Sequence, residues 1–255
     1  MEQAIFGQAL REYLRPRRVI PWIMLGLICA LLAYSWKFLE PKSDALHQYA
    51  NVSSMLVFRI VALASAIFTT AIISQEVEQR TIVYLLTRPV ARWKLLLIRY
   101  LASVLVVAVL GILAALFTSF GAFKTLGGNE LLSKDILALV VGAFAYGALF
   151  LFVSLLFNRA MLVCLLFAFG WETSVPNMPG EMGRLSILTH LQAIAEHPNT
   201  QDQSKLLGLA TGALGTNTIS ASSAWGVLGF ITLICLGLSA WWFTHFEYVP
   251  REDAE

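Results

Sequence analysis

Residues 95–123, LLLIRYLASVLVVAVLGILAALFTSFGAF, are the longest apolar run of the chain and contain one charged residue, Arg99. A helix crosses the hydrocarbon core of a bilayer with about 20 consecutive apolar residues. It also satisfies its own backbone hydrogen bonds, which an apolar environment requires. The run therefore predicts a transmembrane helix.

The composition of the whole chain agrees with a membrane protein. Of its 255 residues, 58% are hydrophobic and 13% are charged, whereas soluble domains carry about 25% charged residues. One core of this size cannot bury so many apolar side chains and still leave a wettable surface. The composition excludes a soluble enzyme, a disordered chain, a collagen and a coiled coil. The net charge of +2 is too small to indicate nucleic-acid binding.

Further apolar runs flank the first. They lie at about residues 19–38, 54–74, 136–157, 160–175 and 224–246, and the run at 160–175 is short for a span. The sequence thus predicts an all-α integral membrane protein with six transmembrane helices. These helices form one membrane domain, residues 19–255, after an N-terminal segment of residues 1–18.

The distribution of positive charge predicts the orientation. Eleven Lys and Arg residues lie in the N-terminal segment, the loop after the second run, the turn between the fourth and fifth runs, and the tail, whereas six lie in the opposite loops. Loops rich in Lys and Arg remain on the cytoplasmic side. We therefore expect both termini in the cytoplasm of a bacterial cell, with the chain in the cytoplasmic membrane.

The N-terminal segment is amphipathic. Its apolar residues are Ile5, Phe6, Ala9, Leu10, Tyr13 and Leu14. Their spacing places them on one stripe of a helix, which predicts a helix lying in the cytoplasmic interface until Pro16 breaks it. Its arginines lie where anionic membrane lipid would bind them. The alternative is a polar tail that happens to contain leucines.

Residues 176–222 form the longest non-spanning segment, on the outer side. Leu185, Leu188, Leu191 and Ile194 recur every three residues, and Pro198 follows. This spacing predicts a short amphipathic helix, and leucines between 206 and 214 suggest a second. We expect both helices to cover the outer ends of the spans.

Motifs of catalysis and metal binding do not occur in the sequence. It contains no GxxxxGK[ST] motif, no HExxH and no G-x-S-x-G. The histidines are scattered at His47, His190, His197 and His245. We therefore expect the chain itself to be no enzyme and to bind no metal or cofactor.

Ionisable residues are scarce within the predicted spans. Ion-coupled carriers usually keep a carboxylate or a histidine at mid-membrane, and here Glu172 lies near the outer end of the fifth run instead. Energy for any transport should therefore come from another subunit. Arg59 lies well inside the second run. It either contacts an anionic substrate or Glu172, or extends to the outer interface.

The loop after the second run is dense in charge yet partly apolar. From position 76 it reads EVEQRTIVYLLTRPVARWK. It is too polar to span a membrane and too apolar for a solvated linker. A short helix, a corner at Arg88-Pro89 and a new helix from about Arg92 would explain this pattern, with Trp93 at interface depth.

This loop resembles the cytoplasmic loop between spans two and three of ABC-2 type transporter permeases, the membrane subunits of ATP-binding cassette exporters. Those loops look like E-x-E-x-x-T-[IL]-x-x-L-L-x-x-P-[VI]-x-R. The matching residues are Glu76, Glu78, Thr81, Ile82, Leu85, Leu86, Pro89, Val90 and Arg92, and Arg80 replaces the usual glycine. The predicted spans, the N-terminal helix and the outer segment extend the resemblance over nearly the whole chain.

The resemblance implies a coupling helix within about residues 75–93 that docks on an ATP-binding subunit. The residues it assigns to coupling are Glu76, Glu78, Arg80, Thr81, Tyr84, Leu85, Leu86, Arg88, Pro89 and Arg92. Two ATP-binding subunits would bind ATP and Mg, which this chain would not. A second permease, identical or related, would complete the translocation path, and the resemblance favours export.

Three other classes compete with this interpretation. A membrane scaffold or assembly protein would have no ATPase partner. An intramembrane enzyme would need paired catalytic residues at one depth, which the sequence does not provide. An ion channel would need a polar stripe, and Thr69, Thr70, Thr118 and Ser119 are too few and also suit helix packing.

Overall fold

The computed structural model describes residues 2–39, 45–78, 92–123, 130–157, 159–177, 181–197 and 219–245, and every regular element in these ranges is helical. The longer helices are α1 (Glu2–Tyr13), α2 (Pro16–Leu39), α3 (Ala45–Val52), α4 (Phe58–Glu78), α6 (Arg92–Phe123), α7 (Glu130–Leu156), α8 (Ala160–Leu166), α10 (Ile187–Ala195) and α12 (Ala221–His245). The short ones are the π-helices η1 (Ser53–Val57) and η2 (Phe167–Trp171), then α9 (Glu172–Ser174), η3 (Val175–Asn177) and η4 (Glu181–Leu185).

Helices long and apolar enough to cross a membrane confirm the all-α membrane fold. Five lie within the described residues: Pro16–Trp36, Gln48–Ile72, Trp93–Phe123, Leu131–Leu156 and Ala221–His245. The fifth predicted run forms a shorter apolar helix, Ala160–Ser174. A span count of six therefore stays a prediction.

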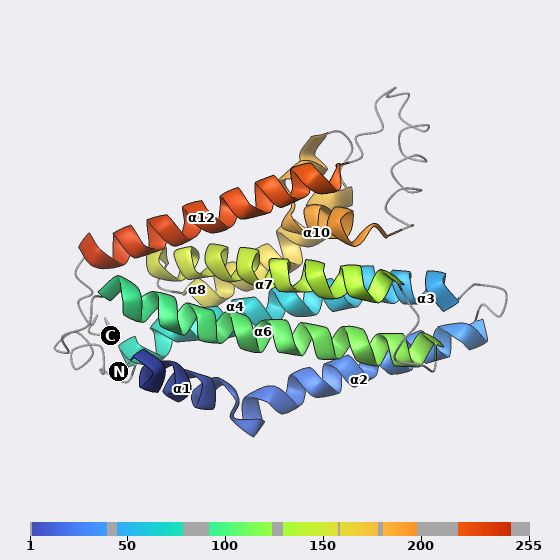
Figure 1. Cartoon of the computed structure of the whole chain (residues 1–255), viewed down its shortest axis with the longest axis horizontal. Coiled ribbons are helices and arrows are strands. Elements are labelled where there is room, and N and C mark those ends of the chain that lie inside the picture. Colours follow the sequence, from blue (N-terminus) through green and yellow to red (C-terminus); the bar gives the residue numbers. More distant parts are fainter. Residues whose placement is uncertain are drawn as a thin grey trace.

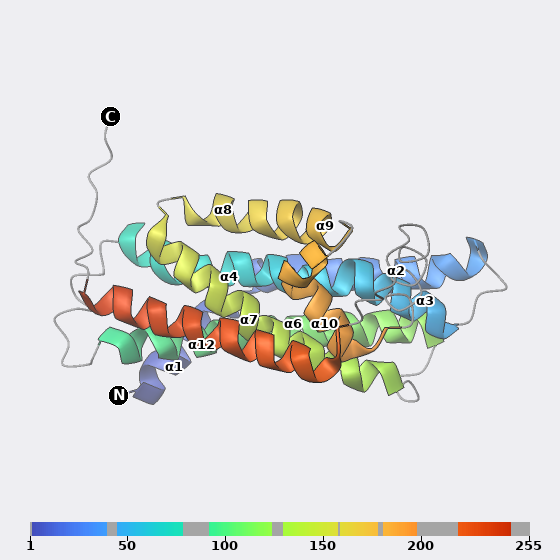
Figure 2. The ribbon, with the colours of Figure 1, turned by 90° about the horizontal axis from the view of Figure 1, so that it is seen from above.

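The long helices form an elongated bundle (Figures 1 and 2). Figure 1 shows α6 between α2 and α7, with α12 on the other side of α7. In the apolar stretch of each span, only 17% of the residues are buried in α2 and in α12, against 56–67% in the three central spans. The central helices α4, α6 and α7 therefore make the core, and the outer pair presents apolar side chains to lipid or to another chain.

The bundle has two distinct ends in Figure 1. At the α1 end lie α1, the last turn of α4, the first turn of α6 and the end of α12. At the α10 end lie α3, the first turn of α7 and α10. The predicted orientation would place the α1 end in the cytoplasm.

Small residues allow the helices to pack closely. A Cβ atom on Gly121 of α6 would lie under 3.0 Å from the carbonyl oxygen of Ala30 in α2. A Cβ on Gly26 of α2 would lie 3.4 Å from the Cα of Ala114. Such close backbone approach is typical of helix pairs in membranes, where dispersion contacts replace the hydrophobic effect.

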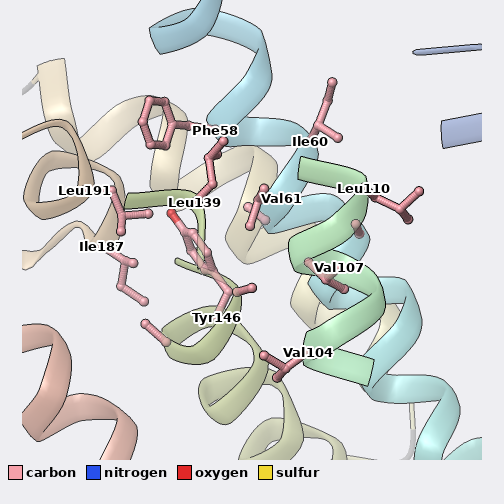
Figure 3. Close-up of a cluster of buried hydrophobic side chains, with 14 of the residues drawn as sticks. Phe58, Ile60, Val61, Val104, Val107, Leu110, Leu139, Tyr146, Ile187 and Leu191 are labelled. Carbon is pink, nitrogen blue, oxygen red and sulfur yellow. The ribbon is translucent and has the colours of Figure 1, made fainter. Parts of the chain in front are cut away.

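The core at the α10 end joins four helices. In Figure 3, side chains of α4, α6 and α7 converge with Ile187 and Leu191 of α10. A Cβ on Gly142 would lie 2.8 Å from Cδ1 of Leu191, so α10 packs directly on the backbone of α7. α10 is thus the first of the two short helices predicted between residues 176 and 222, and the position of this segment on the outer side stays a prediction. The second, at 206–214, lies outside the described residues.

The boundaries of α10 differ from expectation, whereas the buried stripe of α1 agrees with it. The predicted stripe of α10 included Leu185, which is 61% exposed because it precedes the N-cap residue Ser186. The helix ends at Ala195, since Glu196 adopts a left-handed conformation with φ 51°, rather than at Pro198. In α1, Ile5, Ala9 and Tyr13 are buried, as an amphipathic helix requires.

Candidate functional site

The segment with the permease-like motif connects α4 and α6 at the α1 end of the bundle. Its backbone is described up to Glu78, the last residue of α4, and again from Arg92, the first residue of α6. Glu76 and Glu78 therefore lie in the last turn of α4. The other coupling residues lie outside the described residues: Arg80, Thr81, Tyr84, Leu85, Leu86, Arg88 and Pro89.

Helix α1 packs against α4 and α6, the two helices that flank this segment. The ring of Tyr13 meets that of Phe68 of α4 edge to face, with the ring centroids 6.0 Å apart. The guanidinium of Arg99 in α6 interacts electrostatically with Tyr13 and Glu12. Burial raises the pKa of the Tyr13 hydroxyl well above its ordinary value, so Tyr13 stays neutral. These contacts fix α1 against both helices that flank the motif.

The first turn of α6 presents an aromatic anchor. Trp93 is 43% exposed, and the ammonium of Lys94 lies 5.7 Å from the centre of its ring. An exposed tryptophan beside a lysine suits the interface between membrane and water. The first turn of α6 thus places a cation beside an exposed aromatic ring.

Glu172 lies in a different place, near the α10 end, and it is almost fully buried at 2% exposure. Its carboxylate accepts hydrogen bonds from the Ser186 hydroxyl at 2.5 Å and from the backbone N–H groups of Ile187 and Leu188, each at 3.1 Å. It therefore caps the N-terminus of α10, where the helix dipole favours a negative charge.

Arg59 lies at the start of α4 and is partly buried. Its Nε atom makes no hydrogen bond within the described residues, and no ion pair joins it to Glu172 there. It interacts electrostatically with Tyr146 of α7, whose hydroxyl also faces Glu172. Arg59 and Glu172 thus both interact with the same tyrosine. An anionic-substrate role for Arg59 stays a prediction.

Sequence reasoning missed a second buried carboxylate, Asp135. It is fully buried and accepts hydrogen bonds from the hydroxyls of Tyr49 at 2.7 Å and Ser53 at 2.6 Å. Its other oxygen lies 2.6 Å from Nε2 of His197. The fourth span was expected to begin at about residue 136, but the helix that is long and apolar enough to cross a membrane begins at Leu131 and includes Asp135. The apolar Leu131, one turn before Asp135, was the sign in the sequence that the helix begins earlier.

The described residues contain no group of three or more His, Cys, Asp or Glu side chains that could hold a metal ion. In the Asp135 cluster, each oxygen of the carboxylate already faces a hydroxyl or a ring nitrogen of the protein. Fully satisfied polar groups of this kind stabilise contacts between helices.

Comparison with protein families gives the context of these sites. A family model described as "ABC-2 family transporter protein" matches residues 4–245. The chain belongs to this family. The match runs from the first turn of α1 to the last residue of α12 and includes the segment between α4 and α6. A comparison with curated proteins finds no match.

Members of the ABC-2 family are membrane components of ABC transporters rather than ATPases, and they generally work with ATP-binding subunits. The chain is therefore an integral, multi-pass permease component of an ABC transporter.

Proposed function

We propose that this ABC-2 protein forms one half of a translocation path and that ATP hydrolysis in two separate subunits drives it. The observation that carries the proposal is the family match over residues 4–245, together with the motif between α4 and α6. The second half is another permease, identical or related. The transporter exports its substrate from a bacterial cytoplasm, with both termini of this chain inside.

Residues 75–93 form the coupling helix in this proposal. Glu76, Glu78 and Arg92 provide the charged rim, and Tyr84 and Leu85 the apolar anchor of the contact with the ATPase. Such an arrangement of a buried anchor within a polar rim is typical of protein interfaces. ATP and Mg bind to the partner, and this chain binds neither.

The arrangement of α1 supports a mechanical role for this end. Because Tyr13 packs on α4 and Arg99 of α6 interacts with α1, a displacement of the coupling segment reaches three helices together. Closure of two ATPases around ATP would then tilt the central helices rather than bend a flexible loop. The peripheral apolar faces of α2 and α12 offer surface to the second permease and to membrane lipid.

A pull-down from the native membrane in mild detergent tests the proposal. We expect a P-loop ATPase at about one copy per permease, and its loss from the variants Glu76→Gln and Arg92→Gln. The matched control is Arg184→Gln, an exposed cation at the opposite end of the bundle. Recovery of the permease without an ATPase, under conditions that preserve other ABC complexes, would contradict the proposal and favour a membrane scaffold.

A further inference from the structure

Three separate parts of the chain meet at the Asp135 cluster, which consists of Tyr49, Ser53, Asp135 and His197. The hydroxyls come from α3 and η1, the carboxylate from α7 and the imidazole from the residues that follow α10. The partners of Asp135 are 62 to 86 positions away in sequence. Since all the side chains are buried, the cluster ties the α10 end of the bundle together from inside.

The hydrogen bonds of this cluster converge on one carboxylate. Nδ1 of His197 lies 3.2 Å from the carbonyl oxygen of Ala50, which can only accept a hydrogen bond. Nε2 of the same ring lies 2.6 Å from one carboxylate oxygen of Asp135. The hydroxyls of Tyr49 and Ser53 donate hydrogen bonds to the other oxygen. The imidazole therefore bridges the backbone of α3 and the side chain of Asp135 in α7.

Glu172 makes a different kind of contact. Its hydrogen bonds reach residues only 14 to 16 positions ahead, so they close the segment from α9 to α10 on itself. The Asp135 cluster instead joins the end of that segment to α7 and η1. An ion pair of Lys134 with Glu196 and a hydrogen bond of 3.5 Å from Gln192 to the carbonyl of Ser54 lie along the same seam.

Both carboxylates also adjoin a π-helix. Ser53 is the first residue of η1, and Glu172 directly follows η2. A π-turn contains one residue more than an α-turn, so conversion between the two shifts the register of the helix that follows. At η1, the hydrogen bond from Ser53 to Asp135 holds the helix that continues into α4.

We propose that the Asp135 cluster is a latch that keeps the α10 end of the permease closed and is released during the transport cycle. While the latch is closed, α3 and η1 remain attached to α7 and to the end of α10. When it opens, η1 separates from this seam and the α10 end can admit substrate or release it. The inference rests on the proposed transport function, although its closed state can be tested without an ATPase.

Accessibility of a buried cysteine tests the closed latch. Ala50 is fully buried beside His197, and the native Cys29, Cys164 and Cys235 are also buried. The variant Ala50→Cys should therefore react slowly with a membrane-impermeant maleimide, the parent chain giving the background. Ser223→Cys, exposed at the start of α12, gives the reference rate for an open position.

Removal of the charge should expose the probe. A hydrogen bond to a charged group shifts an equilibrium by roughly tenfold to a hundredfold, so Asp135→Asn should raise the labelling rate of Ala50→Cys by about tenfold or more. Tyr49→Phe removes one hydroxyl and should raise the labelling rate by a few-fold. If Asp135→Asn fails to insert into the membrane, the rate in the Tyr49→Phe background tests the latch. Thr244→Ala, which alters an exposed side chain near the end of α12 and away from this seam, should leave the rate unchanged. Equal rates in the parent, Tyr49→Phe and Asp135→Asn backgrounds would overturn the latch.

A cross-link tests release during the cycle. Cysteines at Ser54 and Gln192, joined by a short bifunctional thiosulfonate, would fix η1 to α10. The ATPase rate of the co-purified complex should then fall several-fold and recover on reduction, whereas an unchanged rate would show that the latch does not open. If no ATPase co-purifies, the proposed function fails, and the labelling of Ala50→Cys still tests whether Asp135 closes this end.

Discussion

Replacement of Glu172 by glutamine should destabilise the segment from α9 to α10. In the native protein, Oε2 accepts hydrogen bonds from Ser186 and Leu188, and Oε1 accepts one from Ile187. Glutamine keeps one oxygen and replaces the other with an amino group, which only donates. At least one of the three donors then faces another donor in a buried site.

The size of the effect follows from these contacts. A hydrogen bond to a charged group contributes about 1.5–3 kcal/mol, and a buried donor left without a partner costs about 1–3 kcal/mol. Because Glu172 is 2% exposed, water cannot replace the lost acceptor. We expect a destabilisation of about 3 kcal/mol, which lowers the Tm of a chain of this size by about 6–12 °C.

Thermal unfolding in detergent, followed by size-exclusion chromatography of the heated sample, measures this change. Glu196→Gln is the matched control, because it makes the same substitution at the opposite end of α10 on a side chain that is 52% exposed. Ser186→Ala should lower the Tm less. Combining it with Glu172→Gln should lower the Tm by less than the sum of the two changes, because the two side chains share one hydrogen bond. A Glu172→Gln variant with the Tm of the control would refute the capping argument.

Other substitutions address the remaining contacts. Gly121→Ala should lower the Tm by several degrees because its Cβ meets the backbone of α2, whereas Gly229→Ala, with open space around its Cβ, should leave it unchanged or slightly raised. Tyr13→Ala should cost about 3 kcal/mol and make α1 sensitive to limited proteolysis; unchanged digestion would contradict its packing on Phe68. Arg59→Gln should leave the Tm nearly unchanged if its charge extends to the interface, and a large change in ATPase response to substrate would instead assign it to substrate contact.

The membrane fold could be predicted because its signal is long and repeated. Runs such as 95–123 are apolar on all sides, and no soluble arrangement accommodates several of them in one chain. The α1 helix could be predicted equally well, since Ile5, Ala9 and Tyr13 recur at helical spacing. These features depend on local sequence and on the solvent, so they need no knowledge of which helices are neighbours.

The Asp135 cluster could not be predicted from local sequence, because it depends on which segments are neighbours in the folded protein. Tyr49, Asp135 and His197 lie in different segments, and nothing near any one of them identifies the others. The fourth apolar run was expected to begin at about residue 136, directly after Asp135, so there was no reason in the sequence to place this carboxylate inside the bundle. The carboxylate of Asp135 can lie in the apolar helix α7 only because Tyr49, Ser53 and His197, from other segments, form hydrogen bonds with it.

The two proposed sites lie at opposite ends of one continuous helix. α4 follows η1 directly, where Ser53 binds Asp135, and it ends at Glu78 in the coupling segment. At 1.5 Å per residue, its 21 residues extend about 31 Å. Because its middle is packed against α7, where Thr69 lies beside Gly147, a push at Glu78 displaces α4 as a rigid rod rather than bending it. Its other end can move only if Ser53 separates from Asp135 or η1 changes register, so coupling and latch release are one motion in this proposal.

Asp135→Asn should therefore uncouple ATP hydrolysis from transport while leaving the ATPase bound, and loss of ATPase binding in that variant would show that the two ends do not communicate through α4.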